Sequence, residues 1–191
     1  MAGKQAKIIT PSELQRVLAY ARNGPSPRRD IVIILLSVRA GLRACEIAGL
    51  DWSMVIDSER RVGTLMELRD EIAKKGSGRR IPLHPELRSA LAALKPPKGR
   101  EGPVVVSQRG GPMRANSVVN WFVTAFQAVG AVGCSSHSGR RTFVTMAARS
   151  AHKAGASLRD VQLLAGHRSI ETTQRYIDGD TSAQHRLVRG L

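Results

Sequence analysis

The chain has 191 residues, enough for one sizeable domain that buries a core without cross-links. Thirty lysines and arginines against fifteen acidic residues give a net charge of +15, which predicts a polyanionic partner, because neutralising phosphates releases condensed counterions. Aromatic residues make up only 4% of the chain, too few to favour a protein that holds single-stranded nucleic acid by base stacking. Duplex DNA is therefore the preferred partner. Charge alone leaves RNA and an acidic membrane surface as alternatives.

Cysteine content and hydropathy predict the compartment. Cys45 and Cys134 allow one disulfide at most, and a reduced, intracellular setting is the simpler interpretation. The first ten residues lack the apolar stretch of a signal peptide. The longest apolar run, Ile31–Leu36, is too short to span a bilayer. We therefore expect a cytoplasmic protein with no membrane partner.

The first fifty residues predict three helices. Thr10–Glu13 has the pattern of a capping box with proline at the first helical position, and the segment 23–27 breaks the helix that follows. A second helix is expected from Ser26 to about Arg39, ended by Gly41, because glycine adopts the left-handed cap conformation at little cost. A short helix over Ala44–Ala48 should follow. The inward-facing residues are expected to be Leu14, Val17 and Leu18, then Ile31, Ile34, Leu35 and Val38.

The middle of the chain predicts a small sheet. Trp52–Ile56, Thr64–Leu68 and Arg79–Leu83 are expected to pair as antiparallel strands, with Lys74–Gly78 as a connecting turn. A helix over Pro85–Leu94 and a loop over residues 95–99 should come next.

The rest of the chain predicts further helices. One is expected over Ala115–Val129, and others over about Gly139–Ser150, Ser157–Leu164 and a last segment that runs through Tyr176. The expected fold class is mostly α with a small antiparallel β-sheet (α+β). The residues expected on the inner face of the first of these helices are Val118, Val119, Phe122, Val123 and Phe126.

Five short segments carry a resemblance to a known family. They are Ala40–Ile47, Lys74–Gly76, His137–Arg140, Leu164–His167 and Thr172–Tyr176. In this order and spacing they resemble the catalytic domain of the tyrosine recombinase (phage integrase) family, over nearly the whole chain. Each segment alone is a weak signal, and the ordered set is a strong one.

The resemblance implies the site residues position by position. The lysine is assigned from the match of Lys-x-Gly-x-x-Arg-x-Ile-Pro-Leu to the family pattern, and the acidic residue three positions after the first arginine is expected to orient a basic neighbour. The catalytic positions fall on Arg43, Lys74 (with Lys75 as the fallback), His137, Arg140, His167 and Tyr176, and the supporting acidic position falls on Glu46.

The chemistry of these residue types suits strand exchange. A tyrosine phenol can attack phosphorus and later leave, so Tyr176 would keep the bond energy in a covalent intermediate. Two guanidinium groups, from Arg43 and Arg140, would hold the phosphate oxygens as negative charge develops. Lys74 would protonate the leaving 5′ oxygen as a general acid. His137 would help with the tyrosine proton.

His167 would donate a hydrogen bond to the phosphate. The resemblance implies no cofactor: neither a metal, ATP nor a redox group is needed when arginines neutralise the charge. A metal site is a weaker alternative, because Cys134 and His137 have ligand-like spacing but no second close pair of ligands follows. Taken singly, each of the catalytic positions has an ordinary structural or surface interpretation, and only their joint occurrence argues against it.

The sequence thus predicts a site-specific DNA recombinase or integrase that works through a 3′-phosphotyrosyl intermediate. The alternatives are a type IB-like topoisomerase and a DNA-binding protein of the same fold that does not cut. Residues 1–9 are expected to form a tail, residues 10–180 the catalytic domain, and residues 181–191 a segment that reaches a neighbouring subunit in a homotetramer on duplex DNA.

Two departures from the family pattern bear on these expectations. Arg141 stands where the family often has histidine. The family's separate N-terminal DNA-binding domain has no counterpart in the residues before Thr10. The sequence leaves open a naturally short recombinase and a fragment of a longer one. In both cases DNA binding is expected to be weaker and less site-specific, with an accessory DNA-binding protein as a further partner.

Overall fold

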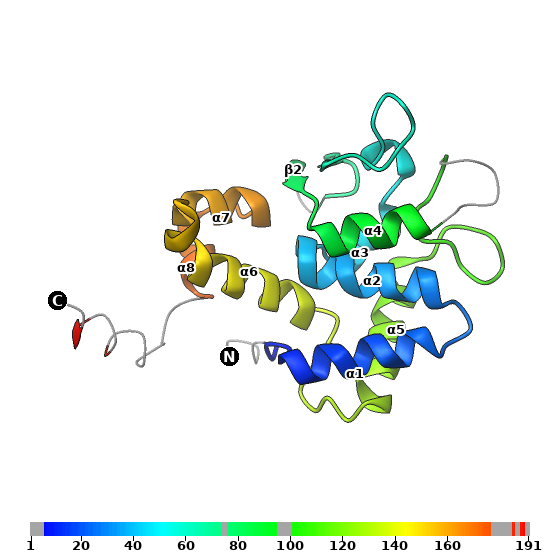
Figure 1. Ribbon diagram of the computed structural model, residues 1–191, viewed down its shortest axis with the longest axis horizontal. Helices are drawn as coiled ribbons and strands as arrows, with labels where there is room; N and C mark the ends of the chain where they lie inside the picture. Colours follow the sequence, from blue (N-terminus) through cyan, green and yellow to red (C-terminus); the bar gives the residue numbers. More distant parts are fainter. Residues whose placement is uncertain (1–5, 74–75, 95–100, 177–184, 186–187, 190–191) are drawn as a thin grey trace. The chain divides into compact units, whose positions relative to one another are not determined.

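A computed structural model describes residues 6–73, 76–94, 101–176, 185 and 188–189 (Figure 1). These residues form a mostly helical protein with a two-stranded antiparallel sheet, so the predicted fold class is confirmed. The chain divides into two compact units, Met1–Phe143 and Val144–Leu191, and each is described by itself.

The elements follow one another in this order: α1 (Pro11–Arg22), α2 (Pro27–Ala40), α3 (Ala44–Gly49), the 3-10 turn η1 (Trp52–Met54), β1 (Leu65–Leu68), β2 (Arg79–Pro82), α4 (Pro85–Ala93), α5 (Ala115–Ala128), α6 (Ser138–Ser150), the 3-10 turn η2 (His152–Ala154), α7 (Leu158–Ala165) and α8 (Ile170–Gln174).

The first two helices form where the sequence predicts them. The Thr10 hydroxyl accepts a hydrogen bond from the Glu13 amide at 3.2 Å, and the Glu13 carboxylate accepts one from the Thr10 amide at 2.9 Å, which completes the capping box. Helix α2 ends at Gly41, whose φ of +66° is the left-handed conformation that glycine adopts most readily.

Helix α2 is the centre of the first unit. Figure 1 shows it between α1 and α4, and it contacts both, together with α3. The expected stripe of four inward residues is too narrow, because the whole run Val32–Leu36 is buried while Ile31 is only half-buried. A helix covered on several sides has no solvent face, so its sequence shows no clean amphipathic period.

The small sheet has two of the three expected strands. β1 and β2 pair antiparallel, and the cross-strand partners Met66 and Ile81 are both buried. The strand predicted over Trp52–Ile56 is wrong. Asp51 instead caps the 3-10 turn η1 by accepting the Ser53 amide at 2.9 Å, and the indole of Trp52 is buried in the core. The apolar character of this segment reflects burial of a turn, not a pleated strand.

Helix α5 packs against α3 and α1 through one narrow face. Val118, Phe122 and Phe126 are buried as expected, and the rings of Phe122 and Phe126 stack with centroids 5.7 Å apart. Val119 is only half-buried and Val123 is 41% exposed, so the expected inner face is too wide.

The second unit contains most of α6, then α7 and α8. Ser157 caps α7 with Asp160 in a capping box, while α8 ends at Gln174, so the last helix does not run through Tyr176 as predicted. The predicted loop over residues 95–99 and most of the C-terminal segment 181–191 lie outside the described residues. Within the described ranges, no helix is long and apolar enough to cross a membrane.

Candidate active site

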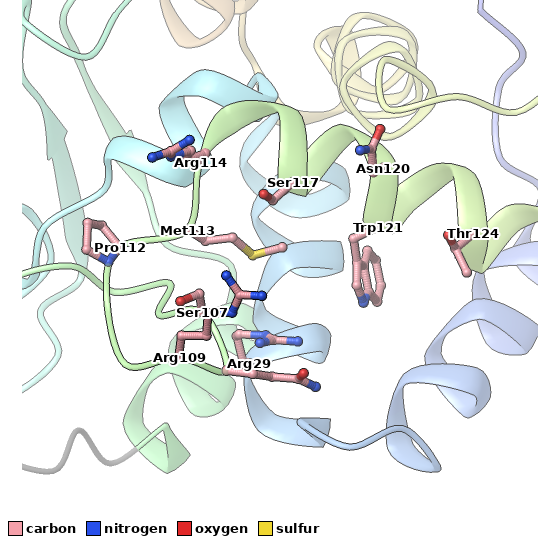
Figure 2. Close-up of a pocket in the computed structure, with 11 residues that line it drawn as sticks. Arg29, Ser107, Arg109, Pro112, Met113, Arg114, Ser117, Asn120, Trp121 and Thr124 are labelled. Atoms are coloured by element: carbon pink, nitrogen blue, oxygen red, sulfur yellow. The ribbon is translucent and has the colours of Figure 1, made fainter.

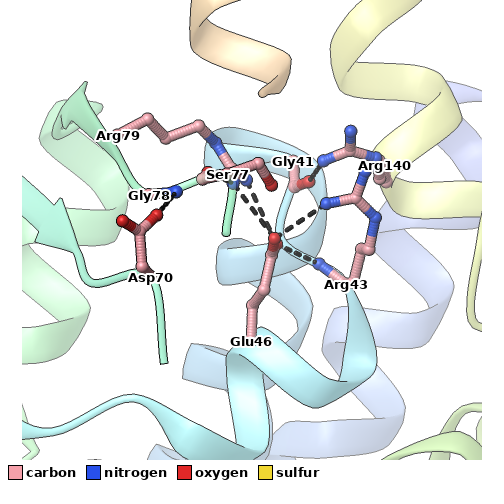
Figure 3. Close-up of polar contacts among 8 residues, drawn as sticks. All are labelled: Gly41, Arg43, Glu46, Asp70, Ser77, Gly78, Arg79 and Arg140. Carbon is pink, nitrogen blue, oxygen red and sulfur yellow. Dashed lines mark hydrogen bonds and ion pairs between the residues drawn. The ribbon is translucent and has the colours of Figure 1, made fainter. Parts of the chain in front are cut away.

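Arg43 directly precedes α3, and the predicted supporting carboxylate, Glu46, lies within that helix. The buried Glu46 accepts the Arg43 amide at 2.8 Å and the Arg43 Nη1 at 2.8 Å (Figure 3). Arg43 keeps 20% of its side chain exposed, whereas Glu46 is fully covered. Glu46 thus contacts a basic neighbour, and that it orients this neighbour for catalysis stays a prediction.

A second arginine shares the same carboxylate. Arg79 on β2 donates from Nη1 to Glu46 Oε1 at 3.0 Å and from Nη2 to Oε2 at 3.1 Å. Burial alone would raise the pKa of Glu46, but the hydrogen bonds and charge of Arg79, helped by the Arg43 amide and guanidinium, hold that pKa below its usual value. Glu46 is therefore an ionised, buried carboxylate between two cations.

The sequence alone indicated no role for Arg79. Its signal was present in the arginine of the Lys-x-Gly-x-x-Arg-x-Ile-Pro-Leu pattern, which stands five residues after Lys74. Nothing local shows which acidic residue that arginine meets, since Glu46 lies 33 positions earlier in the chain.

Arg140 is brought to the same place by a backbone contact. It lies in the first turn of α6, is 3% exposed, and donates from Nη1 to the Gly41 carbonyl at 2.7 Å. Because Gly41 precedes Arg43 by two residues, this bond brings the Arg140 guanidinium to the N-terminal end of α3 (Figure 3).

Close packing around two glycines sets the position of α6. A Cβ on Gly41 would overlap the ring of Phe143, and a Cβ on Gly139 would overlap the hydroxyl of Ser37. The start of α6 therefore approaches the end of α2 more closely than any side chain would allow. This approach is what puts Arg140 within reach of the Gly41 carbonyl.

His137 directly precedes α6, its side chain is exposed, and its amide donates to the Ser135 hydroxyl at 3.3 Å. Lys74 and the fallback Lys75 lie outside the described residues. On the described residues that flank them in the chain, Asp70 Oδ1 accepts the Gly78 amide at 2.7 Å (Figure 3).

The second unit brings His167 and Tyr176 together. Their rings stack with centroids 5.4 Å apart and an interplanar angle of 25°. The His167 Nδ1 shares a 2.9 Å hydrogen bond with the hydroxyl of Thr173, which is fully buried. Gln162 holds the backbone of His167, because its Nε2 donates to the His167 carbonyl at 2.9 Å.

Tyr176 is held mainly through its backbone. Its amide donates to the Thr173 carbonyl at 3.0 Å, and its carbonyl accepts the Thr145 hydroxyl at 3.4 Å. Thr173 thus contacts both members of the His–Tyr pair. This residue was missed in the sequence, where it is one of two threonines between His167 and Tyr176.

A hollow of about 710 Å³ lies on the outer side of α5, and we call it the basic hollow. It is lined among others by Arg29, Arg109 and Arg114, and Figure 2 shows Arg29 and Arg109 directed into it. Arg29 is fixed by the buried Asp30 through two contacts of 2.7 Å. Burial raises the pKa of Asp30, while hydrogen bonds from Arg29 and the Trp121 indole oppose that rise.

No acidic side chain lines the basic hollow among the residues that the structure describes. In the same described ranges, no three histidines, cysteines or acidic residues gather as a group that could hold a metal ion.

Comparison with known proteins gives consistent matches. The profile of the phage integrase family covers residues 7–182. The chain is 33% identical over 153 residues to the tyrosine recombinase XerC of Corynebacterium efficiens, across 78% of this chain and 46% of that protein. It therefore spans about half the length of the curated relatives it matches.

Two solved structures share the fold at low sequence identity. XerA recombinase superimposes with a TM-score of 0.73 at 20% identity, across 98% of this chain and 65% of that one. The structure of a lambda integrase dimer bound to a COC′ core site superimposes with a TM-score of 0.69 at 21% identity, across 92% of this chain and 49% of that one. With the profile match over most of its length, the chain belongs to the phage integrase family.

Proposed function

We propose that this chain is the catalytic part of a site-specific recombinase that cuts and rejoins duplex DNA. The Tyr176 hydroxyl gives up its proton and attacks a backbone phosphorus, which forms a 3′-phosphotyrosyl bond and breaks the bond to the 5′ oxygen. A 5′ hydroxyl from another strand then attacks the same phosphorus and releases the tyrosine. Each step exchanges one phosphate ester for another, so no ATP, metal or redox group is required.

The observation that carries this proposal is the meeting of Arg43 and Arg140 at the end of α2. The two residues are far apart in the sequence, yet the Gly41 carbonyl and the Glu46 carboxylate orient them at one place. Guanidinium groups fixed before the reaction can stabilise the charge that develops on phosphate oxygens without reorganising.

The other residues take the remaining proton steps. Lys74, or Lys75 in its place, protonates the leaving 5′ oxygen as a general acid. His137, exposed at the start of α6, accepts the proton of the attacking phenol. His167 donates to a phosphate oxygen from Nε2, in the tautomer whose Nδ1 accepts the Thr173 hydroxyl.

Duplex DNA is the proposed partner. The net charge of +15 and the basic hollow supply cations for phosphates away from the cleaved one. The lambda integrase structure, by its description, contains a dimer bound to a core site. We propose that this chain acts as a homotetramer on paired sites, with residues 181–191 reaching a neighbour, and with an accessory DNA-binding protein.

Trapping the covalent intermediate tests the function. Nicked duplexes that lose a short fragment after cleavage would be offered as a randomised pool, and adducts that survive boiling in detergent would be collected and sequenced. An adduct from the wild type supports cleavage. Binding without an adduct, in the presence of host extract, would favour the non-cutting DNA-binding protein, and relaxation of supercoils without recombinant products would favour the topoisomerase.

A further inference from the structure

Arg79 is a buried cation whose contacts lie next to the proposed catalytic arginines. Only 5% of its side chain is exposed, compared with 20% for Arg43. Its guanidinium forks onto both oxygens of Glu46 and also donates to the Ser77 carbonyl at 3.3 Å. Both Nη groups of Arg79 already donate to Glu46, so the role of Arg79 is to hold that carboxylate within the protein.

The acceptor capacity of Glu46 explains what this fork does. A carboxylate has about four lone-pair sites. Arg43 takes one on each oxygen, through its amide and Nη1, and Arg79 takes one on each oxygen through its two Nη groups. The carboxylate is therefore filled, and Arg43 can give it only a single side-chain bond.

This division leaves Arg43 with donors to spare. Within the described part of the chain, no partner is recorded for its Nε or Nη2. If Arg79 were absent, Glu46 would have two vacant acceptor sites and a single cationic partner. The favourable bidentate Arg–carboxylate geometry would then draw the Arg43 guanidinium fully onto Glu46.

We propose that Arg79 is a positioning residue for DNA cleavage: by occupying one side of Glu46, it keeps the Arg43 guanidinium turned outward for the phosphate. The inference rests on the proposed function. The low pKa of Glu46 supports this role, since Arg79 contributes more to lowering it than Arg43 does.

The neighbouring Arg80 provides a matched control. It is the next residue on β2, its side chain is 74% exposed, and it pairs with Glu67 at 2.8 Å on the opposite face. Arg80→Lys changes the same residue type on the same strand but cannot reach Glu46. Its cleavage rate should stay within about twofold of the wild type, as expected for an exposed ion pair.

The experiment compares Arg79→Lys with Arg80→Lys in single-turnover cleavage at saturating DNA, with DNA affinity and thermal unfolding measured in parallel. Lysine keeps the charge of Arg79 but loses the fork. We expect Arg79→Lys to fold, to bind DNA nearly as well as the wild type, and to cleave roughly 10–100-fold more slowly, because the loss is one of orientation.

A double-mutant cycle with Glu46→Gln separates positioning from a purely structural role. If Arg79 acts through Glu46, the double variant should cleave about as fast as Glu46→Gln alone, since the two changes break the same contact. Losses that multiply, or an Arg79→Lys variant that cleaves at the wild-type rate, would overturn the inference.

A spectroscopic measurement keeps the test independent of cleavage. The Nε–Hε resonance of Arg43, assigned through Arg43→Lys, would be followed during titration with inorganic phosphate. It should shift in the wild type and in Arg80→Lys but be altered and unresponsive in Arg79→Lys. If the wild type never forms a DNA adduct, the proposed function fails, while an unchanged Arg43 resonance in Arg79→Lys would sink the positioning role by itself.

Discussion

The arginine cluster around Glu46 and the His167–Tyr176 pair are held by different forces. In the first, a fully buried carboxylate receives four hydrogen bonds, three of them from guanidinium groups. In the second, a ring stack and a hydrogen bond to Thr173 hold the histidine beside the tyrosine. Charge-assisted bonds are roughly twice as strong as neutral ones.

This difference matches the tasks proposed for the two regions. Cations that stabilise a developing charge work best when they do not move. A nucleophile must instead attack, stay bonded and leave again, and it follows α8, a helix of only five residues that depends on tertiary contacts for its stability. Substitutions in the arginine cluster should therefore reduce both stability and cleavage, whereas those near the tyrosine should mainly reduce cleavage.

The largest effect is expected from Tyr176→Phe. Removing the hydroxyl deletes the nucleophile but keeps the ring that stacks on His167, so adducts should disappear while thermal unfolding changes little. Tyr20→Phe is the matched control, because Tyr20 is the other tyrosine of the chain and lies on α1. If Tyr176→Phe still formed an adduct and Tyr20→Phe did not, the nucleophile would be Tyr20 and the proposed role of Tyr176 would be wrong.

Arg140→Lys should lower both the cleavage rate and the free energy of unfolding. Lysine cannot fork onto a phosphate, so the cleavage rate should fall about 10²–10³-fold. The buried Gly41 carbonyl would lose its donor, which should cost about 1–3 kcal/mol of unfolding free energy. Single-turnover cleavage and urea unfolding measure the two effects. Arg149→Lys, an exposed position later in α6, serves as control, and equal losses in both variants would contradict a specific role for Arg140.

Thr173→Val should affect cleavage more than stability. Valine keeps the buried volume but removes the hydroxyl that binds His167 Nδ1 at 2.9 Å. The unfolding free energy should fall by about 1 kcal/mol, and the cleavage rate by roughly tenfold, because the imidazole loses its fixed orientation. Thr172→Val is the control, since among the described residues its hydroxyl contacts that of Ser169 and not His167. If Thr173→Val lost much stability but cleaved at the normal rate, the predicted difference between the arginine cluster and the His167–Tyr176 pair would be wrong.

The sequence predicted local features of the fold well and long-range ones poorly. The capping box at Thr10 and the glycine that ends α2 are signals within one turn of chain. The strand expected over Trp52–Ile56 failed because buried turns and buried strands are both apolar. Val123 was expected inside, but how wide a face α5 buries depends on neighbours that periodicity does not reveal.

The same limit applies to the site. The family resemblance pointed to Arg43, Glu46 and Arg140, and the structure places them together in the first unit. Arg79 escaped notice because its importance comes from pairing with a carboxylate on another element. Thr173 escaped notice because a buried hydroxyl and an exposed one look alike in a sequence.

Arg109→Ala tests the basic hollow as a DNA contact outside both regions. If Arg109 meets one phosphate, the slope of log affinity against log salt should fall by about 1, and affinity should drop modestly for all sequences alike. Cleavage at saturating DNA should not change. Arg61→Ala removes an equal charge, but one already paired with Glu59 and Asp57, so an identical salt slope in both variants would show that only net charge matters.

The smallest expected effects on cleavage concern carboxylates that cap helices in the two units, where only stability should change. In the first unit, the Lys7 hydrogen bond and the Thr10 amide lower the pKa of Glu13 from 4.5 to about 2. In the second, the Ser157 hydroxyl and amide lower the pKa of the exposed Asp160. A carboxyl whose pKa is lower in the folded than in the unfolded state stabilises the fold fully when the pH is above the unfolded-state pKa. This contribution is lost as the pH falls through the folded-state pKa.

Both contributions should therefore be present at pH 6 and decline at acid pH, for Glu13 between about pH 4.5 and 2. Glu13→Gln should cost about 1–2 kcal/mol at pH 6, moderated by the half-exposed Lys7, and should make the first unit less sensitive to acid. Asp160→Asn should have a smaller effect, confined to α7. Hydrogen exchange of the amides in α1 and α7, measured from pH 6 downward, separates the two units, and a larger loss from Asp160→Asn would mean that the second unit, not the first, relies on its charged contacts.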